Sequence, residues 1–214
     1  MMNIAGALVL TNDILSKKFH VVSANVASDL VEVYELANSI SLEAMNAKVL
    51  VARSGDKALG FRPITDFMVE MSDETIRLVE AINIEALLVS RLSVKLIRAS
   101  IRTKHLELAQ VRSMGAIYEN SIQNLLAVSA KGEEHMARQL EKHTVQLIKL
   151  LDDINSHMIA AQIMSGTSRI EAASVDVRYR TNFQSVSTKL DEASKGIRRR
   201  VVENKKYLLR TLEH

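Results

Sequence analysis

Two histidines are the side chains in this 214-residue chain whose type and spacing could hold a metal or a haem. His143 and His157 both occupy core positions of one helical pattern, two heptads apart, and a histidine there could also sense pH. On one helix they would lie about 21 Å apart, so they cannot share an ion within one chain. Polar residues at such positions more often set the register or oligomeric state of packed helices. We therefore predict no metal and no cofactor.

Catalytic motifs are missing from the sequence. It contains no phosphate-binding glycine loop, no Gly-x-Ser-x-Gly and no His-Glu-x-x-His pattern. The adjacent Asp152 and Asp153 would point in different directions on a helix, so they cannot work as a catalytic pair. The chain has no cysteine, which excludes disulfides, thiolate metal sites and a cysteine nucleophile. We predict that the protein is not an enzyme and acts by binding other proteins.

Basic residues form two clusters, which could meet anionic lipid or nucleic acid. The first runs along one helix face, and the second lies near the C-terminus; their members are Arg91, Lys95, Arg98 and Arg102, and Lys195, Arg198, Arg199, Arg200, Lys205 and Lys206. The net charge is only +3 and aromatic residues make up 4% of the chain, so base stacking has little support. Solvated helix faces are the simpler interpretation, which disfavours nucleic acid and leaves a membrane surface as a lesser alternative.

The composition favours few, long helices. Hydrophobic residues make up 47% of the chain, while there are seven glycines, one proline and no tryptophan. No apolar run approaches the ~18 residues that cross a bilayer, and the apolar stretch 4–10 has no basic residue before it, as a signal peptide would. With no cysteine, this predicts a cytoplasmic protein. Residues 212–214 resemble the start of a vector-encoded tag.

Glycine and proline divide the chain at nearly equal intervals. The strongest break is the cluster Gly55, Gly60 and Pro63, where Pro63 suits the first turn of a following helix. A second turn is expected near 165–168, where Gly166 could end a helix and the next two hydroxyl residues could cap another. A middle break is expected near Gly115, with Gly132 as the competing position. This predicts one elongated domain over 1–211, with hairpins over about 10–113 and 116–211.

Heptad patterns support these helices, because apolar residues recur at alternating intervals of four and three. In the first segment they are Val26, Leu30, Val33, Ala37, Ile40, Ala44, Ala47 and Val51. In the second they are Met68, Met71, Thr75, Leu78, Ile82, Glu85, Val89, Leu92, Leu96 and Ala99. In the third they are Met136, Leu140, His143, Leu147, Leu150, Ile154, His157, Ala161 and Met164. In the fourth they are Ile170, Ala173, Val177, Val186, Leu190, Ala193, Ile197, Val201 and Leu208. The predicted fold is all-α, an up-down four-helix bundle of long antiparallel coiled-coil helices.

The first hairpin turn carries a more specific pattern. Small residues and glycines surround it at fixed spacing, at Ala44, Asn46, Ala47, Ala52, Arg53, Gly55, Gly60 and Phe61. This stretch resembles the cytoplasmic signalling tip of methyl-accepting chemotaxis receptors, in which Leu-Asn-Ala-Ala-Ile-Glu-Ala-Ala-Arg-Ala-Gly-Glu turns through Gly-Arg-Gly-Phe. The resemblance covers about residues 20–75. Leu50 and Leu59 stand where the family has its Glu and its turn Arg.

The resemblance implies a set of partner contacts. Asn46 and Arg53 would belong to the face between receptors, while Asp56, Phe61 and Ile64 would lie near the contacts with the chemotaxis histidine kinase and coupling protein. A receptor tip is a four-helix bundle of two hairpins from two subunits, and two hairpins in series would let one chain build it. The stretch 129–137, with Glu133 and Glu134 among small residues, is similar to a receptor methylation site, although such patterns are common on helices.

We therefore expect a soluble chemoreceptor-like signalling protein that docks through its hairpin tip onto the kinase, the coupling protein or receptor tips. One alternative is a structural coiled coil that acts as a scaffold or homodimerises, since heptad stripes can be satisfied within one chain or between two. The other is a module that binds nucleic acid or a membrane surface through its basic end, which would show a salt-dependent affinity.

Overall fold

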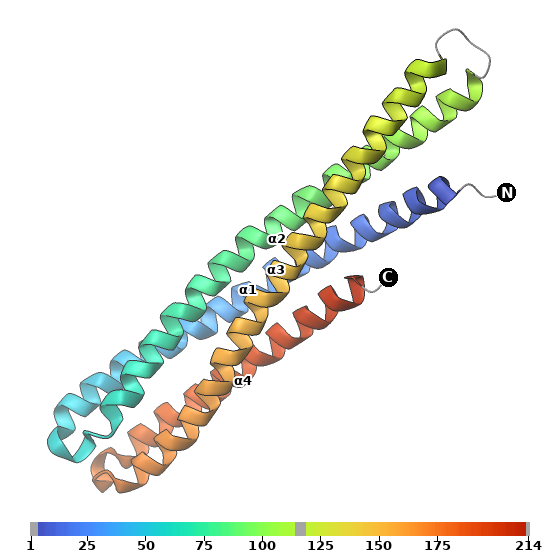
Figure 1. Cartoon of the computed structure of the whole chain (residues 1–214). Helices are drawn as coiled ribbons and strands as arrows, with labels where there is room; N and C mark the ends of the chain where they lie inside the picture. The colour runs from blue at the N-terminus through green and yellow to red at the C-terminus, as the bar shows by residue number, and fades with distance from the viewer. Residues whose placement is uncertain (1–3, 114–118, 213–214) are drawn as a thin grey trace. The chain divides into compact units, whose positions relative to one another are not determined.

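The computed structural model describes residues 4–113 and 119–212. These residues form four α-helices and one short 3-10 helix, and none of them forms a strand, which confirms the all-α prediction. The helices are α1 (Ile4–Ser54), η1 (Gly55–Ala58), α2 (Phe61–Arg112), α3 (Glu119–Ser174) and α4 (Val177–Leu212), as Figure 1 shows. None of these described helices has a stretch apolar enough to cross a membrane.

The break between α1 and α2 lies within the predicted range 55–63. The backbone of Gly55 has φ +62°, a conformation in which other residues are strained. Pro63 lies in the first turn of α2, where backbone N–H groups have no partner within the helix, so its missing N–H costs no hydrogen bond. Gly55 therefore allows the positive φ angle at the end of α1, and Pro63 is compatible with the first turn of α2.

The middle break lies between Arg112, where α2 ends, and Glu119, where α3 begins. Gly115 itself lies outside the described residues. The competing position, Gly132, is inside α3, so the chain continues as a helix there.

The turn predicted near 165–168 is wrong, because α3 continues through it to Ser174. The hydroxyl residues that suggested a cap are used inside the helix instead. The Ser165 hydroxyl donates to the carbonyl oxygen of Gln162 (2.8 Å), and the Ser168 hydroxyl lies 2.5 Å from that of Ser187 on α4. Serine side chains can thus be satisfied within a helix that packing has already specified.

The observed turn between α3 and α4 has neither glycine nor proline. Asp176 caps α4, since its Oδ1 accepts a hydrogen bond from the backbone N–H of Arg178 (3.1 Å). The displaced turn leaves Ile170, Ala173 and Val177 exposed, although they were predicted as core of the fourth helix. The later predicted positions of that helix, from Val186 to Leu208, are buried.

The heptad predictions differ in accuracy between helices. All eight predicted positions of the first segment are buried. In α3 only every second predicted position is buried, at Leu140, Leu147, Ile154 and Ala161. At the other core positions the buried residue is the one after the predicted residue, namely Thr144, Leu151, Met158 and Ser165. The predicted and the observed core stripes of α3 therefore have about half of their residues in common. The observed stripe continues through Ser168 to Ala172, beyond the turn that was expected.

The contacts divide the chain into two compact units, each drawn from all four helices. Unit 1 comprises 1–26, 84–147 and 207–214, and unit 2 comprises 27–83 and 148–206. The single domain over 1–211 stays a prediction.

The core of unit 1 joins α1, α2 and α3. Phe19, Val89, Leu96 and Leu140 are buried together there. Leu212, which the sequence suggested to be part of a tag, packs against this cluster, while residues 213 and 214 lie outside the described range.

The core of unit 2 is closed at its turns by two aromatic rings. Phe61 at the start of α2 stacks on Phe183 of α4, with ring centroids 4.0 Å apart and planes at 29°. Both rings are fully buried. Away from the turns, the Ser72 hydroxyl donates to the carbonyl oxygen of Ala37 (2.5 Å), which ties α2 to α1.

We predict that Phe183→Ala lowers the free energy of unfolding by about 3–5 kcal/mol, because it leaves a cavity against Phe61. Urea unfolding followed by circular dichroism measures this. Val31→Ala, at an exposed position of the same unit, should change it by less than about 0.5 kcal/mol. A loss at residue 183 as small as that of the control would contradict the role of the ring pair.

Candidate docking surface

The tip of unit 2 is formed by two turns that lie side by side (Figure 1). Besides the stacked rings, Gly60 lies so close to Glu171 of α3 that an added Cβ would collide with its carboxylate. This carboxylate is next to the start of α2, where a negative charge is favoured by the helix dipole. The turn of the first hairpin is therefore held by the second.

Three of the five predicted partner-binding residues are exposed at this tip. Asn46 and Arg53 lie on the last turns of α1, and Asp56 lies in η1. Arg53 forms no ion pair with any described residue, so its guanidinium is available to a partner. The turn residues Gly55, Gly60 and Pro63 are also exposed.

The other two predicted residues require correction. Phe61 is 0% exposed and Ile64 is 3% exposed, so both side chains belong to the core of unit 2. Phe61 contacts Phe183 rather than a partner. The two positions follow directly after the turn, where α2 must already present apolar side chains to α1, α3 and α4.

An apolar stripe on α1 was not predicted. Leu42, Met45 and Val49 are 60%, 56% and 50% exposed, and Val31 and Tyr34 are exposed further along the helix. Their intervals of three, eight, three and four residues place them on one face, opposite the buried stripe of the same helix. The signal was present in the sequence as a second heptad stripe, but the first stripe already explained the helix.

Charged residues flank this stripe without entering its centre. Lys48 pairs with Asp66 of α2 (2.8 Å), and Glu43 pairs with Lys189 of α4 (2.5 Å). An apolar centre with a polar rim is the usual anatomy of a protein interface. We call Leu42, Met45, Asn46, Val49 and Arg53 the tip surface.

The two core histidines have separate environments. In unit 1, Nδ1 of His143 lies 2.8 Å from Oε2 of Glu85, and both side chains are about one-fifth to one-quarter exposed. In unit 2, Nδ1 of His157 is buried without a hydrogen-bond partner, beside a cavity of about 360 Å³ between α2 and α3. Among the described residues no group of three potential ligands could hold a metal ion.

The two glutamates of the methylation-like stretch also differ. Glu133 is buried, and the hydroxyl of Thr103 donates to it while also lying 2.7 Å from that of Ser129. Glu134 is exposed and pairs with Arg138 (2.7 Å). Only Glu134 is therefore open to an enzyme that would modify it.

The two basic clusters are neutralised to different extents. In the C-terminal cluster, Lys195 pairs with Asp191, Lys205 with Asp152 and Arg200 with Glu32. The α2 residues Arg91, Lys95, Arg98 and Arg102 are exposed and form no ion pair with any described residue. The first cluster is thus exposed and has no ion partner among the described residues, whereas three members of the second are paired within the chain.

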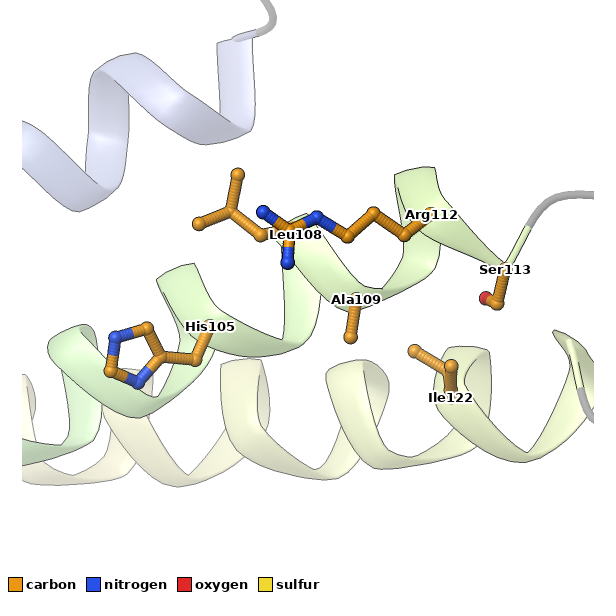
Figure 2. Close-up of a pocket in the computed structure, with 6 residues that line it drawn as sticks. All are labelled: His105, Leu108, Ala109, Arg112, Ser113 and Ile122. Carbon is orange, nitrogen blue, oxygen red and sulfur yellow. The ribbon is translucent and has the colours of Figure 1, made fainter.

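A surface hollow of about 520 Å³ lies between the end of α2 and the start of α3 in unit 1. Figure 2 shows Ala109 and Ile122 facing each other across it, with Arg112 and Leu108 on the other side of α2. Its described lining residues include one imidazole, His105, and one guanidinium, Arg112, but no carboxylate, so they form no acid–base pair.

Asp191 on α4 has a pKa below the ordinary value. A hydrogen bond from Lys195 (2.8 Å) is the main cause; partial burial opposes it, and Arg169 (2.9 Å) lowers the pKa further. The ionised carboxylate therefore links two turns of α4 to α3.

Comparison with protein-family models finds no match to this chain. Comparisons with curated proteins and with solved structures find none either.

We predict that Thr103→Val destabilises the protein by about 1–3 kcal/mol, because it leaves the buried Glu133 carboxylate without its donor. Thr103→Ser keeps the hydroxyl and should cost much less. Chemical unfolding of both variants measures the difference. Equal losses would show that the methyl group, rather than the hydrogen bond, matters.

We predict that the stabilisation contributed by Asp191 disappears only in acid. Its pKa is lower in the folded protein, so the contribution is complete above the ordinary Asp pKa of about 3.9 and is lost as the pH falls through the folded value. The free energies of unfolding of wild type and Asp191→Asn should therefore differ at neutral pH and converge in acid. In a Lys195→Met background the difference should be smaller; an unchanged difference would contradict the assigned cause.

Proposed function

We propose that this chain is a cytoplasmic, non-enzymatic, chemoreceptor-like signalling protein that docks onto chemotaxis proteins through the tip surface. The observation that carries the proposal is an exposed apolar stripe at the hairpin turn, next to an arginine that pairs with no described residue. The stripe lies on the residues whose sequence resembles the receptor signalling tip. Its partners would be the histidine kinase, the coupling protein or receptor tips.

The proposal includes an antiparallel, up-down arrangement of the four helices in unit 2. Contacts between neighbouring helices support it, because residue numbers rise on one helix as they fall on the other. The pairs are Lys48–Asp66 and Ala37–Ser72 for α1 and α2, Glu43–Lys189 and Glu32–Arg200 for α1 and α4, and Ser168–Ser187 and Asp152–Lys205 for α3 and α4. One chain would thus supply the two hairpins that a receptor dimer contributes jointly.

Docking would use shape and charge rather than catalysis. Leu42, Met45 and Val49 would be removed from water against an apolar patch of the partner, which is favourable in proportion to the buried area. Arg53 would fix the orientation by pairing with a carboxylate, and Asn46 would add a hydrogen bond at the rim. The buried rings of Phe61 and Phe183 would keep this surface rigid, so that little ordering accompanies binding.

The test is binding of the purified chain to the chemotaxis kinase, coupling protein and receptor tips of its own organism. We expect Met45→Glu with Arg53→Glu to weaken binding at least ~10-fold, because it places charge in the apolar centre and reverses the anchoring charge. Both side chains are exposed, so the helical content should not change.

The matched control for the charge reversal is Arg199→Glu, which makes the same change as Arg53→Glu at an exposed position of α4 in the same unit. It should leave the affinity within about twofold, since a charge remote from the contact acts weakly. If the wild-type chain binds none of the three partners, the resemblance reflects a similar hairpin only, and the structural scaffold becomes the better explanation.

A further inference from the structure

One face of α3 in unit 2 is apolar, and no described residue covers it. Ile163 and Ile170 are 69% and 77% exposed, and Ile159 lies on the same face. Their intervals of four and seven residues place them in one line, opposite the side that faces the core. Exposed isoleucines in a continuous line are unusual on a soluble helix, where single apolar residues are scattered.

This face also has no charged residue. Between Asp153 and Arg169 the helix contains no Asp, Glu, Lys or Arg. Depletion of charge marks the centre of protein interfaces, whereas solvated helix faces are usually rich in charge. The exposed residues between the isoleucines are small, among them Ser156, Ala160 and Thr167.

Gly166 provides an independent argument. It lies inside α3, where glycine lowers helix stability relative to alanine. The chain's own packing does not require it, since a Cβ at this position would meet no atom within 4 Å. Gly60 and Gly196 differ, because a Cβ there would press against Glu171 and Leu36, respectively, while Gly132 of α3 is also open but lies beside charged residues. A glycine with open space on an apolar face suits the close approach of something outside the chain.

We propose that this face binds the same face of a second copy of the chain, with the two α3 helices antiparallel. An axis near residues 164 and 165 would place each Ile163 over Gly166 of the other copy, and each Ile159 beside Ile170. The side chain of Ile163 would fill the space that Gly166 leaves open. The same patch would thus serve both copies, as a two-fold interface requires.

Charges at the two ends of the face do not oppose the contact. Asp152 precedes it and pairs with Lys205, and Arg178 follows it and pairs with Asp176. Because both charges are neutralised within the chain, neither end repels the identical face of a second copy. The antiparallel orientation rests on the fit of Ile163 over Gly166.

This contact goes beyond the tip surface, which lies on α1 and takes a different partner. A single helix pair is small for a protein interface, so the dimer should be weak and concentration-dependent. It would let the chain present two copies of unit 2 while the α1 faces stay free.

The first experiment is sedimentation equilibrium of the full chain from about 1 to 200 µM, a range that covers weak association. We expect a monomer–dimer equilibrium that Ile163→Glu abolishes. Met45→Glu is the matched control, since it places the same charge at a similarly exposed position of α1, and it should leave the equilibrium unchanged. A monomer throughout the range overturns the proposal. So does a dimer that Met45→Glu removes and Ile163→Glu does not, which would assign self-association to α1.

A second variant separates the interface from helix stability. Gly166→Leu should raise the melting temperature of the monomer, because leucine favours the helix and has room. It should nevertheless weaken dimerisation at least ~10-fold, because the side chain of Ile163 loses its space. A variant that is more stable and dimerises as before would contradict the proposed packing.

Cross-linking tests the orientation. The chain has no cysteine, so Ser156→Cys and Ser174→Cys each introduce a single thiol. In the antiparallel dimer these positions lie opposite each other, whereas identical positions are about 25 Å or more apart along the axis. Mild oxidation of a mixture of the two variants should give the mixed disulfide, and each variant alone should give little. Efficient cross-linking of either variant alone would show a parallel contact and overturn the proposal.

Discussion

The stacked rings of Phe61 and Phe183 are the contact on which the tip of unit 2 depends. A long helical hairpin is held along its length by many small contacts, but its turn has no partner unless another element covers it. Here the first residue of α2 is itself the covering contact, and it reaches α4 across the core. Because the ring is fixed, the preceding glycines and the last turn of α1 are fixed with it, and with them Arg53 and Asn46 on the surface.

In unit 1, two pairs of polar residues within the heptads meet each other, whereas His157 in unit 2 has no such partner among the described residues. Glu85 and His143 interrupt the apolar stripes of two different helices, and the structure brings them within 2.8 Å. Glu133 and Thr103 likewise meet within unit 1. Each pair is satisfied in only one register of α2 against α3, whereas apolar layers would tolerate a shift by a heptad. A shift would leave buried carboxylates without donors, which is costly.

Helix ends and core stripes were predicted correctly where the local sequence pattern was unambiguous. The buried stripe of α1 and the break at Gly55 were predictable, because the eight core positions follow one unbroken alternation and because glycine and proline cluster at the break. In α3 two registers shared every second residue, and the choice depended on where the helix ended. That end was missed because Asp176 caps α4 with no glycine or proline nearby. In addition, Gly166 and the hydroxyl residues next to it form a sequence that is typical of a turn, although α3 continues through them. Once the turn was misplaced, Ile170 and Val177 were assigned to the core. Their exposure, and that of Met45, depends on tertiary packing that a single helical pattern does not contain.

The outer faces of the helices in unit 2 are of two kinds. The exposed residues of α2 in this unit, such as Asp66, Glu70 and Arg77, are charged, and those of α4 are mostly polar or charged. By contrast, α1 and α3 each expose an apolar stripe in addition to the one that they bury. The two apolar faces differ in how they could select a partner. The face of α1 ends in the exposed guanidinium of Arg53, which can discriminate between partners by charge. The face of α3 has no charge along its centre and can discriminate only by shape, for which isoleucines aligned with a glycine are suited when the partner is an identical helix.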